Sequence, residues 1–111
     1  MPKLYYASPR DLPLITPWPG AKGRVLHADN ATLVEFDFEP KIVIDTHKHD
    51  VEEFGVVVKG SLAMIIAGEQ RILTAGDTYR IPANAAHGIR VFEEPTQIID
   101  VYAPARPDLF S

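Results

Sequence analysis

The sequence has no cysteine, which excludes both disulfide bonds and thiolate metal sites. Basic residues are sparse too, because 11 lysines and arginines against 15 acidic residues give a net charge of −4 without any basic cluster. A protein that binds nucleic acid needs a positively charged surface, so nucleic acid is not an expected partner. No hydrophobic run is long enough for a signal peptide or a membrane span, which predicts a cytoplasmic protein without a membrane partner.

The composition that is present is globular, with 46% hydrophobic and 23% charged residues in a chain of 111. A chain of this length forms one core and one domain. Closely spaced prolines at the start of the chain exclude a long helix there. We therefore predict an extended N-terminal arm over residues 1–22 and one folded domain over residues 23–111. The arm is too apolar to remain free and packs either on its own domain or on a second subunit, both of which stay open; its apolar residues are Leu12, Leu14, Ile15 and Trp18.

The rest of the chain has the two-residue period of β-strands. In residues 32–38, one face carries Thr32, Val34, Phe36 and Phe38. Further β-branched stretches, separated by glycine- or proline-containing turns, are KIVIDT, FGVVVK, SLAMIIA, QRIL, DTYRIP, HGIRVF and TQIIDVY. Short strands separated by turns about every 8 to 12 residues indicate an all-β protein, either an antiparallel sandwich or a small barrel.

The segment DTHKHDVEEFG contains a candidate metal site. His47, His49 and Glu53 have the same parity, so on extended chain their side chains project to one face. Two imidazoles and one carboxylate suit a borderline divalent metal. A bare HxH motif is also compatible with a polar surface loop, and its spacing alone does not decide between the two.

The wider spacing resembles the two conserved motifs of the cupin family. HKH, three residues, Glu53, six residues and Gly60 match the first motif, while Gly76, Pro82 and His87 match the second. This resemblance implies a cupin double-stranded β-helix, which is a small jelly-roll barrel. It also implies one divalent metal ion per chain, and the ligands carried over are His47, His49, Glu53 and His87. Nickel, zinc, iron, manganese, cobalt and copper all accept such a ligand set, so the sequence does not select the metal.

Three positions depart from the cupin motifs, and none of them is a ligand. Lys41 and Asn84 stand where the motifs have glycine, and Val91 stands where the second motif ends in asparagine. Asparagine tolerates the positive φ of a turn glycine, so the departures concern turn geometry. The remaining histidine, His27, is expected to be an ordinary strand residue.

The last predicted strand places a carboxylate among apolar residues. In TQIIDVY, Asp100 shares one face with Ile98 and Tyr102, and the opposite face is also largely apolar. An unpaired buried charge is costly. Asp100 is therefore either paired with Arg90 or Arg106, or it is a general acid or base close to the metal.

The ending DVYAPARPDLF is similar to that of the cupins that speed ketonisation of unsaturated monouronates in pectin and alginate breakdown. That resemblance implies a catalytic set of Asp100, Tyr102 and Arg106, although the group has Phe more often than Tyr and Gln more often than Glu53. It predicts a metal-dependent isomerase or tautomerase of a small anionic sugar acid. Asp100 would move the proton, Arg106 would orient the carboxylate, and Tyr102 with Phe54 or Ile89 would wall the pocket.

Two other functions use the same predicted ligands. One is an iron- or manganese-dependent dioxygenase, and the other is a binding or sensor module that holds a small ligand without turnover. A homodimer is also expected, because the arm is apolar and cupins often pair their sheets.

Overall fold

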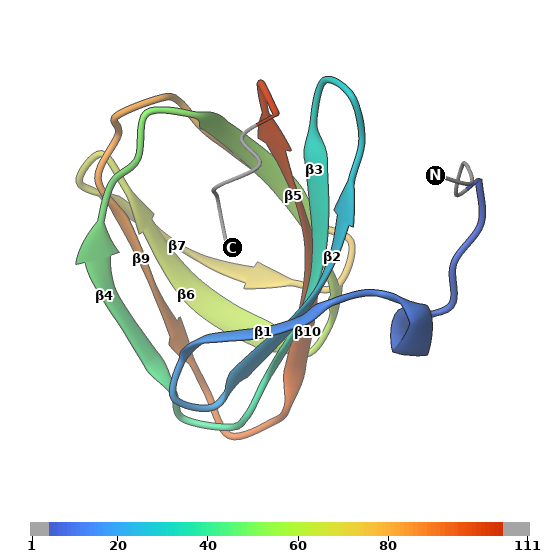
Figure 1. The fold of residues 1–111 in the computed structure, drawn as a ribbon. Coiled ribbons are helices and arrows are strands. Elements are labelled where there is room, and N and C mark those ends of the chain that lie inside the picture. The colour runs from blue at the N-terminus through green and yellow to red at the C-terminus, as the bar shows by residue number, and fades with distance from the viewer. Residues whose placement is uncertain (1–4, 106–111) are drawn as a thin grey trace.

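The computed structural model describes residues 5–105, which form ten β-strands and one short 3-10 helix (Figure 1). The helix is η1 (Pro9–Asp11), and the strands are β1 (Leu14–Trp18), β2 (Ala21–His27), β3 (Thr32–Phe38), β4 (Val43–His47), β5 (Glu52–Lys59), β6 (Ser61–Ile66), β7 (Glu69–Thr74), β8 (Thr78–Ile81), β9 (His87–Val91) and β10 (Thr96–Ala103). The predicted all-β class is confirmed. Residues 5–105 contain no helix that is long and apolar enough to cross a membrane.

The strands form two sheets that face each other, as Figure 1 shows. In the part of the chain described, one sheet has six strands in the order β1-β2-β3-β10-β5-β8, and the other has four in the order β4-β9-β6-β7. The chain passes repeatedly from one sheet to the other, which gives the predicted jelly-roll barrel. The order also brings β4 beside β9, so the two histidine-containing motifs become neighbours.

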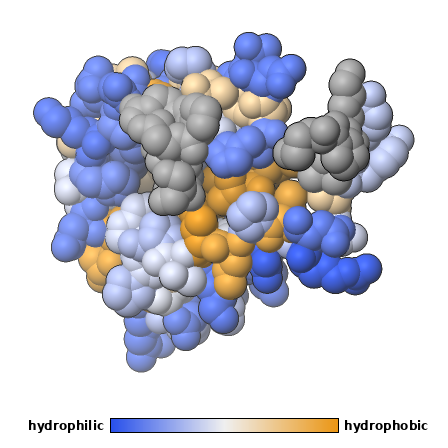
Figure 2. All heavy atoms as spheres, in the orientation of Figure 1, coloured by the Kyte–Doolittle hydropathy of each residue, from blue (hydrophilic) through white to orange (hydrophobic). Residues whose placement is uncertain are grey.

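The core lies between the sheets and follows the predicted alternation. In β3 the predicted inward residues are buried and the intervening ones are more exposed. β10 alternates in the same way, with Ile98, Asp100 and Tyr102 buried. Figure 2 shows hydrophobic side chains gathered in the middle of the face seen in Figure 1, with hydrophilic side chains around them.

The C-terminal part of the predicted arm is a strand of the barrel. β1 pairs with β2 in antiparallel register, and Arg24 donates a hydrogen bond of 3.1 Å to the carbonyl oxygen of Leu12. In this segment the arm packs on its own domain. β2 begins at Ala21, so the boundary predicted after residue 22 falls inside a strand. The prolines exclude a helix but not an edge strand, and Pro17 lies in β1 at the edge of its sheet.

Two turns show how the departures from the cupin motifs are accommodated. Lys41 and Asn84 adopt φ values of 67° and 66°, in the left-handed region that favours glycine. The backbone N–H of Asn84 donates a 2.7 Å hydrogen bond to the carbonyl oxygen of His49. The turn at Asn84 is thereby tied directly to the first motif.

Candidate metal centre

Three histidines meet inside the barrel. His47 ends β4, His87 begins β9, and the two are partners in the antiparallel register. Their ring centroids are 4.4 Å apart, and the His49 ring lies 4.8 Å from that of His87. One candidate donor nitrogen from each ring lies within 4.8 Å of the others. The predicted convergence of the two motifs is thus present in the structure.

Backbone carbonyl groups orient all three imidazoles in the same way. The Nδ1 atom of each ring lies 2.9 Å from a carbonyl oxygen, and the acceptors are Asp45, Val51 and Ala85 in chain order. A carbonyl oxygen only accepts, so each Nδ1 carries the hydrogen. Each neutral ring therefore has its lone pair on Nε2, which is the arrangement that a metal-ligating histidine requires.

His87 provides the test of whether these residues fit a metal ion. Its side chain is buried, with 3% of the residue exposed, and its Nε2 atom has no hydrogen-bond partner among the described residues. An unpaired buried nitrogen is destabilising. Nickel, zinc, iron and their neighbours accept imidazole nitrogen, so a metal ion would satisfy this atom. The donor set and its orientation fit a divalent transition metal.

Glu53 lies against two of the three imidazoles. Its Oε1 atom is 3.0 Å from Nε2 of His49 and 3.5 Å from Nε2 of His87. Burial alone would raise the pKa of Glu53, but the adjacent His49, His87 and Asp100 side chains outweigh burial and lower the pKa to about 2. The Glu53 hydrogen bond in turn raises the pKa of His49, against an opposing effect of burial. Glu53 is therefore an anionic group facing the histidine cluster.

Asp100 is a second carboxyl group in the same interior, with 2% of the residue exposed. Burial raises the pKa of Asp100 well above its usual range, and the negative charge of Glu53 raises it further. Of the two carboxyl groups, Asp100 is the one whose protonated form these surroundings favour. The Tyr79 hydroxyl donates a hydrogen bond to Oδ1 of Asp100, and the Tyr102 hydroxyl lies 3.4 Å from Oδ2.

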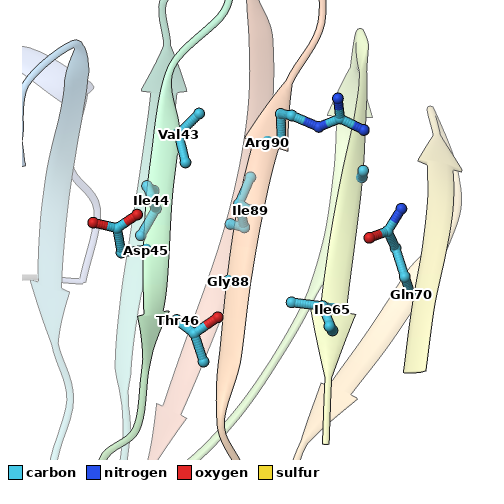
Figure 3. Close-up of a pocket in the computed structure, with 10 residues that line it drawn as sticks. Val43, Ile44, Asp45, Thr46, Ile65, Gln70, Gly88, Ile89 and Arg90 are labelled. Carbon is cyan, nitrogen blue, oxygen red and sulfur yellow. The ribbon is translucent and has the colours of Figure 1, made fainter. Parts of the chain in front are cut away.

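One of the two alternatives for Asp100 was a pairing with Arg90 or Arg106, and among the described residues the pairing with Arg90 is absent. The Arg90 guanidinium carbon instead lies 5.4 Å from the centre of the Phe92 ring. Arg90 lines a groove of about 170 Å³ along β4, β9, β6 and β7, and Figure 3 shows its side chain among the other lining residues, none of which is a histidine. Arg106, the other predicted partner, lies outside the described residues.

The walls of the site differ in part from the prediction. Ile89 and Tyr102 line the cavity beside the histidines as expected. Phe54 is 44% exposed and does not line it, because it has the opposite parity to Glu53 on β5 and faces outward. Trp18, which was not predicted to be a site residue, lines the cavity with its ring centroid 5.5 Å from that of His47.

The enclosed volume at the centre of the site is about 20 Å³, which holds about one water molecule or ion. A sugar-sized ligand therefore reaches the histidines only from the mouth of this cavity.

Tyr79 was also missed in the sequence. The signal available was its alternation with Ile81 in the DTYRIP strand, where both residues are buried, but a buried tyrosine alone does not distinguish a core residue from a site residue.

The chain belongs to the cupin family. The Cupin domain family model matches residues 34–102, which include both histidine-containing motifs. The chain is therefore a small jelly-roll cupin whose three histidines are grouped for metal binding.

Among individual proteins, the chain is 34% identical over 99 residues to the pectin degradation protein KdgF of Dickeya dadantii (strain 3937), covering 84% of this chain and 90% of that protein. The solved structure of KdgF from Halomonas sp. is similar with a TM-score of 0.86 at 25% identity, covering 96% of this chain and 99% of that one. An RmlC-like cupin from Shewanella frigidimarina NCIMB 400 has a TM-score of 0.86 at 23% identity over 96% of each chain, a likeness of fold alone.

Proposed function

We propose that the protein binds one divalent metal ion and catalyses ketonisation of a small unsaturated uronate. The proposed ligands are His47, His49, His87 and Glu53. The observation that carries the reaction is the buried Asp100 carboxyl group beside the histidine cluster and Glu53, where burial raises its pKa well above the ordinary value. The 34% identity to a pectin degradation protein supports a pectin-derived sugar acid as the substrate.

The oriented Nε2 atoms and the unpaired Nε2 of His87 support the proposed metal ligands. When bound, a divalent ion at this position supplies a Lewis acid that stabilises negative charge developing on an enol oxygen. Among the proposed ligands, Glu53 contributes one negative charge, and the three imidazoles are neutral when they bind a metal ion. The site as a whole then remains positive with a dication, which favours an anionic substrate.

Asp100 is the proposed proton donor to carbon. In ketonisation an enol O–H bond breaks and a C–H bond forms, while the composition of the sugar acid is unchanged. Asp100 gives its proton to carbon, and the enol proton returns to the Asp100 carboxylate, so the enzyme ends the cycle as it began. Burial raises the pKa of this carboxyl group well above its ordinary value, which favours the protonated form that this role requires.

The remaining roles concern position and water exclusion. Ile89, Tyr102 and Trp18 narrow the cavity, and so keep water from competing for the proton. Arg106 is proposed to hold the substrate carboxylate with its bidentate guanidinium, on the strength of the sequence resemblance alone.

The proposal is tested by following the vinyl proton of an unsaturated monouronate by NMR. The metal-loaded protein should convert the enol form well above the protein-free rate. Asp100→Asn, which preserves size but removes the acid, should bring the rate close to the blank. His27→Gln changes a histidine whose ring contacts Thr32 rather than the cluster, and serves as the matched control with an unchanged rate. Equal rates for wild type and Asp100→Asn would refute the proposed role of Asp100.

The homodimer and the cytoplasmic location stay predictions. Light scattering of the purified protein tests the first, and cell fractionation tests the second.

A further inference from the structure

Asp100 receives a hydrogen bond from a residue on a strand that is not its neighbour. Asp100 is on β10, Tyr79 is on β8, and β5 lies between them. We propose that Tyr79 is a positioning residue for Asp100, and that it acts through a gap left by Gly55 on the middle strand. This inference rests on the proposed function, because it assigns Tyr79 the task of aiming the proposed proton donor.

The register of the sheet places the three residues in one row. Asp100 is the partner of Gly55 in the β10/β5 pair, and Gly55 is the partner of Tyr79 in the β5/β8 pair. Neighbouring strands are separated by about 4.8 Å, so Asp100 and Tyr79 start roughly 10 Å apart. The Tyr79 and Asp100 side chains together span this distance, provided that nothing projects from the middle strand.

Gly55 keeps that path open. A Cβ atom at Gly55 would lie 2.6 Å from the Tyr79 hydroxyl oxygen, and it would also collide with Oδ1 of Asp100 and the carbonyl oxygen of Ile99. Glycine weakens a strand interior, and commonly marks a place where another group approaches closely. The glycine within the FGVVV strand thus has a physical reason, which is the passage of the Tyr79 phenol.

Asp100 needs external groups to set its direction. The terminal torsion of an aspartate is broad, so the covalent structure does not fix the plane of the carboxyl group. Tyr79 holds Oδ1, while the Tyr102 hydroxyl lies at the longer distance of 3.4 Å from Oδ2. Loss of the Tyr79 hydroxyl therefore removes one of the groups that fix the carboxyl plane and leaves the hydrogen bond between Asp100 and Glu53.

The Tyr79 ring has a separate, structural contact. It lines a groove of about 430 Å³ on β6, β7 and β8, where Met64 and Leu73 are among its neighbours. Tyr79→Phe retains the ring and removes only the hydroxyl, so this variant separates the positioning role from packing. Tyr6→Phe removes the same atom from a residue that is 90% exposed, and is the matched control.

The experiment compares metal-loaded wild type, Tyr79→Phe and Tyr6→Phe in the ketonisation assay, together with metal content, melting temperature and the ¹³Cγ signal of Asp100. Asp100→Asn identifies that signal. In Tyr79→Phe we expect kcat to fall on the order of 10- to 100-fold with KM within about twofold, since substrate binding is untouched. Metal content should remain that of wild type, and the Asp100 signal should shift. Tyr6→Phe should match wild type throughout.

Gly55→Ala supplies a second variant and should lower kcat at least as far, because the added methyl group displaces the phenol. Where Gly55→Ala does not fold, Tyr79→Phe decides alone. The inference is overturned by a Tyr79→Phe kcat within twofold of wild type, by a kcat loss that follows metal loss, or by an unmoved Asp100 signal. If the wild-type protein does not speed ketonisation, the proposed function is refuted instead. The Asp100 signal in Tyr79→Phe then decides whether Tyr79 positions this carboxyl group.

Discussion

His47 and His87 are direct partners across the β4/β9 pair, although 39 positions of the numbered sequence separate them. A register shift between Ile44 and His47 sets this pairing, and it brings the two ring centroids to 4.4 Å. Two residues that begin and end strands thus form the base of the metal centre, and His49 follows in the connection after β4. The geometry of the centre is consequently set by strand pairing.

His87→Ala should abolish stoichiometric metal binding while the barrel remains folded. The core lies between two sheets that are hydrogen-bonded independently of any ion, so we expect a destabilisation of about 1–3 kcal/mol, typical of a buried truncation. Elemental analysis and circular dichroism check the two parts. His27→Ala, a matched histidine truncation, should keep one equivalent of metal. Retention of one equivalent by His87→Ala would refute its role as a ligand.

Trp18 should report metal binding through its fluorescence. It is the one tryptophan in the chain, and its ring centroid lies 5.5 Å from that of His47. Titration of metal-free protein with Cu²⁺ or Ni²⁺ should quench the emission with a break at about one equivalent, since both ions accept imidazole ligands. His49→Ala should shift the break or remove it. A quench that is linear beyond several equivalents would indicate collisional quenching and no specific site.

The metal-free protein should melt at a higher temperature at pH 6 than at pH 8. The pKa of His49 is raised above 6.5 by Glu53, so its contribution is present below 6.5 and lost as pH rises through the folded value. Burial raises the pKa of Asp100 well above 3.8, so stability also falls as pH rises from 3.8 toward the folded pKa of Asp100. Glu53 acts at the other end, because its pKa of about 2 lies below the ordinary 4.5 and its stabilisation is lost as pH falls from 4.5.

Differential scanning calorimetry checks this profile, with a shift of roughly 4–8 °C expected for each kcal/mol of stability lost. Combining His49→Asn with Asp100→Asn should nearly flatten the profile between pH 6 and 8. Metal affinity should follow the opposite trend and rise with pH, because protons and metal compete for Nε2. A metal-free melting temperature that rises from pH 6 to pH 8 would contradict these pKa directions.

Lys41→Gly should stabilise the protein. Lys41 has a φ of 67°, a conformation that destabilises a residue with a Cβ by about 1–2 kcal/mol. Glycine avoids this strain, but its greater conformational entropy in the unfolded chain destabilises the folded state by roughly 0.5–1 kcal/mol. The net gain should be on the order of 0.5–1 kcal/mol in urea unfolding. Lys41→Ala is the control: it also removes the exposed 3.3 Å ion pair with Glu93 but keeps the Cβ, so it should give no gain.

Sequence periodicity predicted the all-β class and which residues share a face in β3 and β10, because a strand with one buried face repeats every two residues, while the jelly-roll barrel was implied by the resemblance of the two motifs to the cupin family. The same rule explains the Phe54 error, since its parity is opposite to that of Glu53 and already places it outside. Tyr79 and Trp18 could not be recognised as site residues for a different reason. Each contact depends on which strands lie side by side, and that order is a property of the whole fold.

The candidate ligand residues could be named from sequence because two spaced motifs contain them. The orientation of the imidazoles was not, since the carbonyl acceptors of Nδ1 depend on local backbone direction. The Glu53 and Asp100 interaction was equally hidden, because it requires the β10/β5 register.

The central claim is that the histidine cluster holds one metal ion on which ketonisation depends. Its most direct test is the ketonisation rate of an unsaturated monouronate, measured by NMR with native, metal-stripped and metal-restored protein at equal concentration. The account predicts that stripping reduces the rate to the protein-free value, and that about one equivalent of a divalent metal restores it. A rate that is unchanged by stripping, or that never exceeds the protein-free value with any metal, would contradict it.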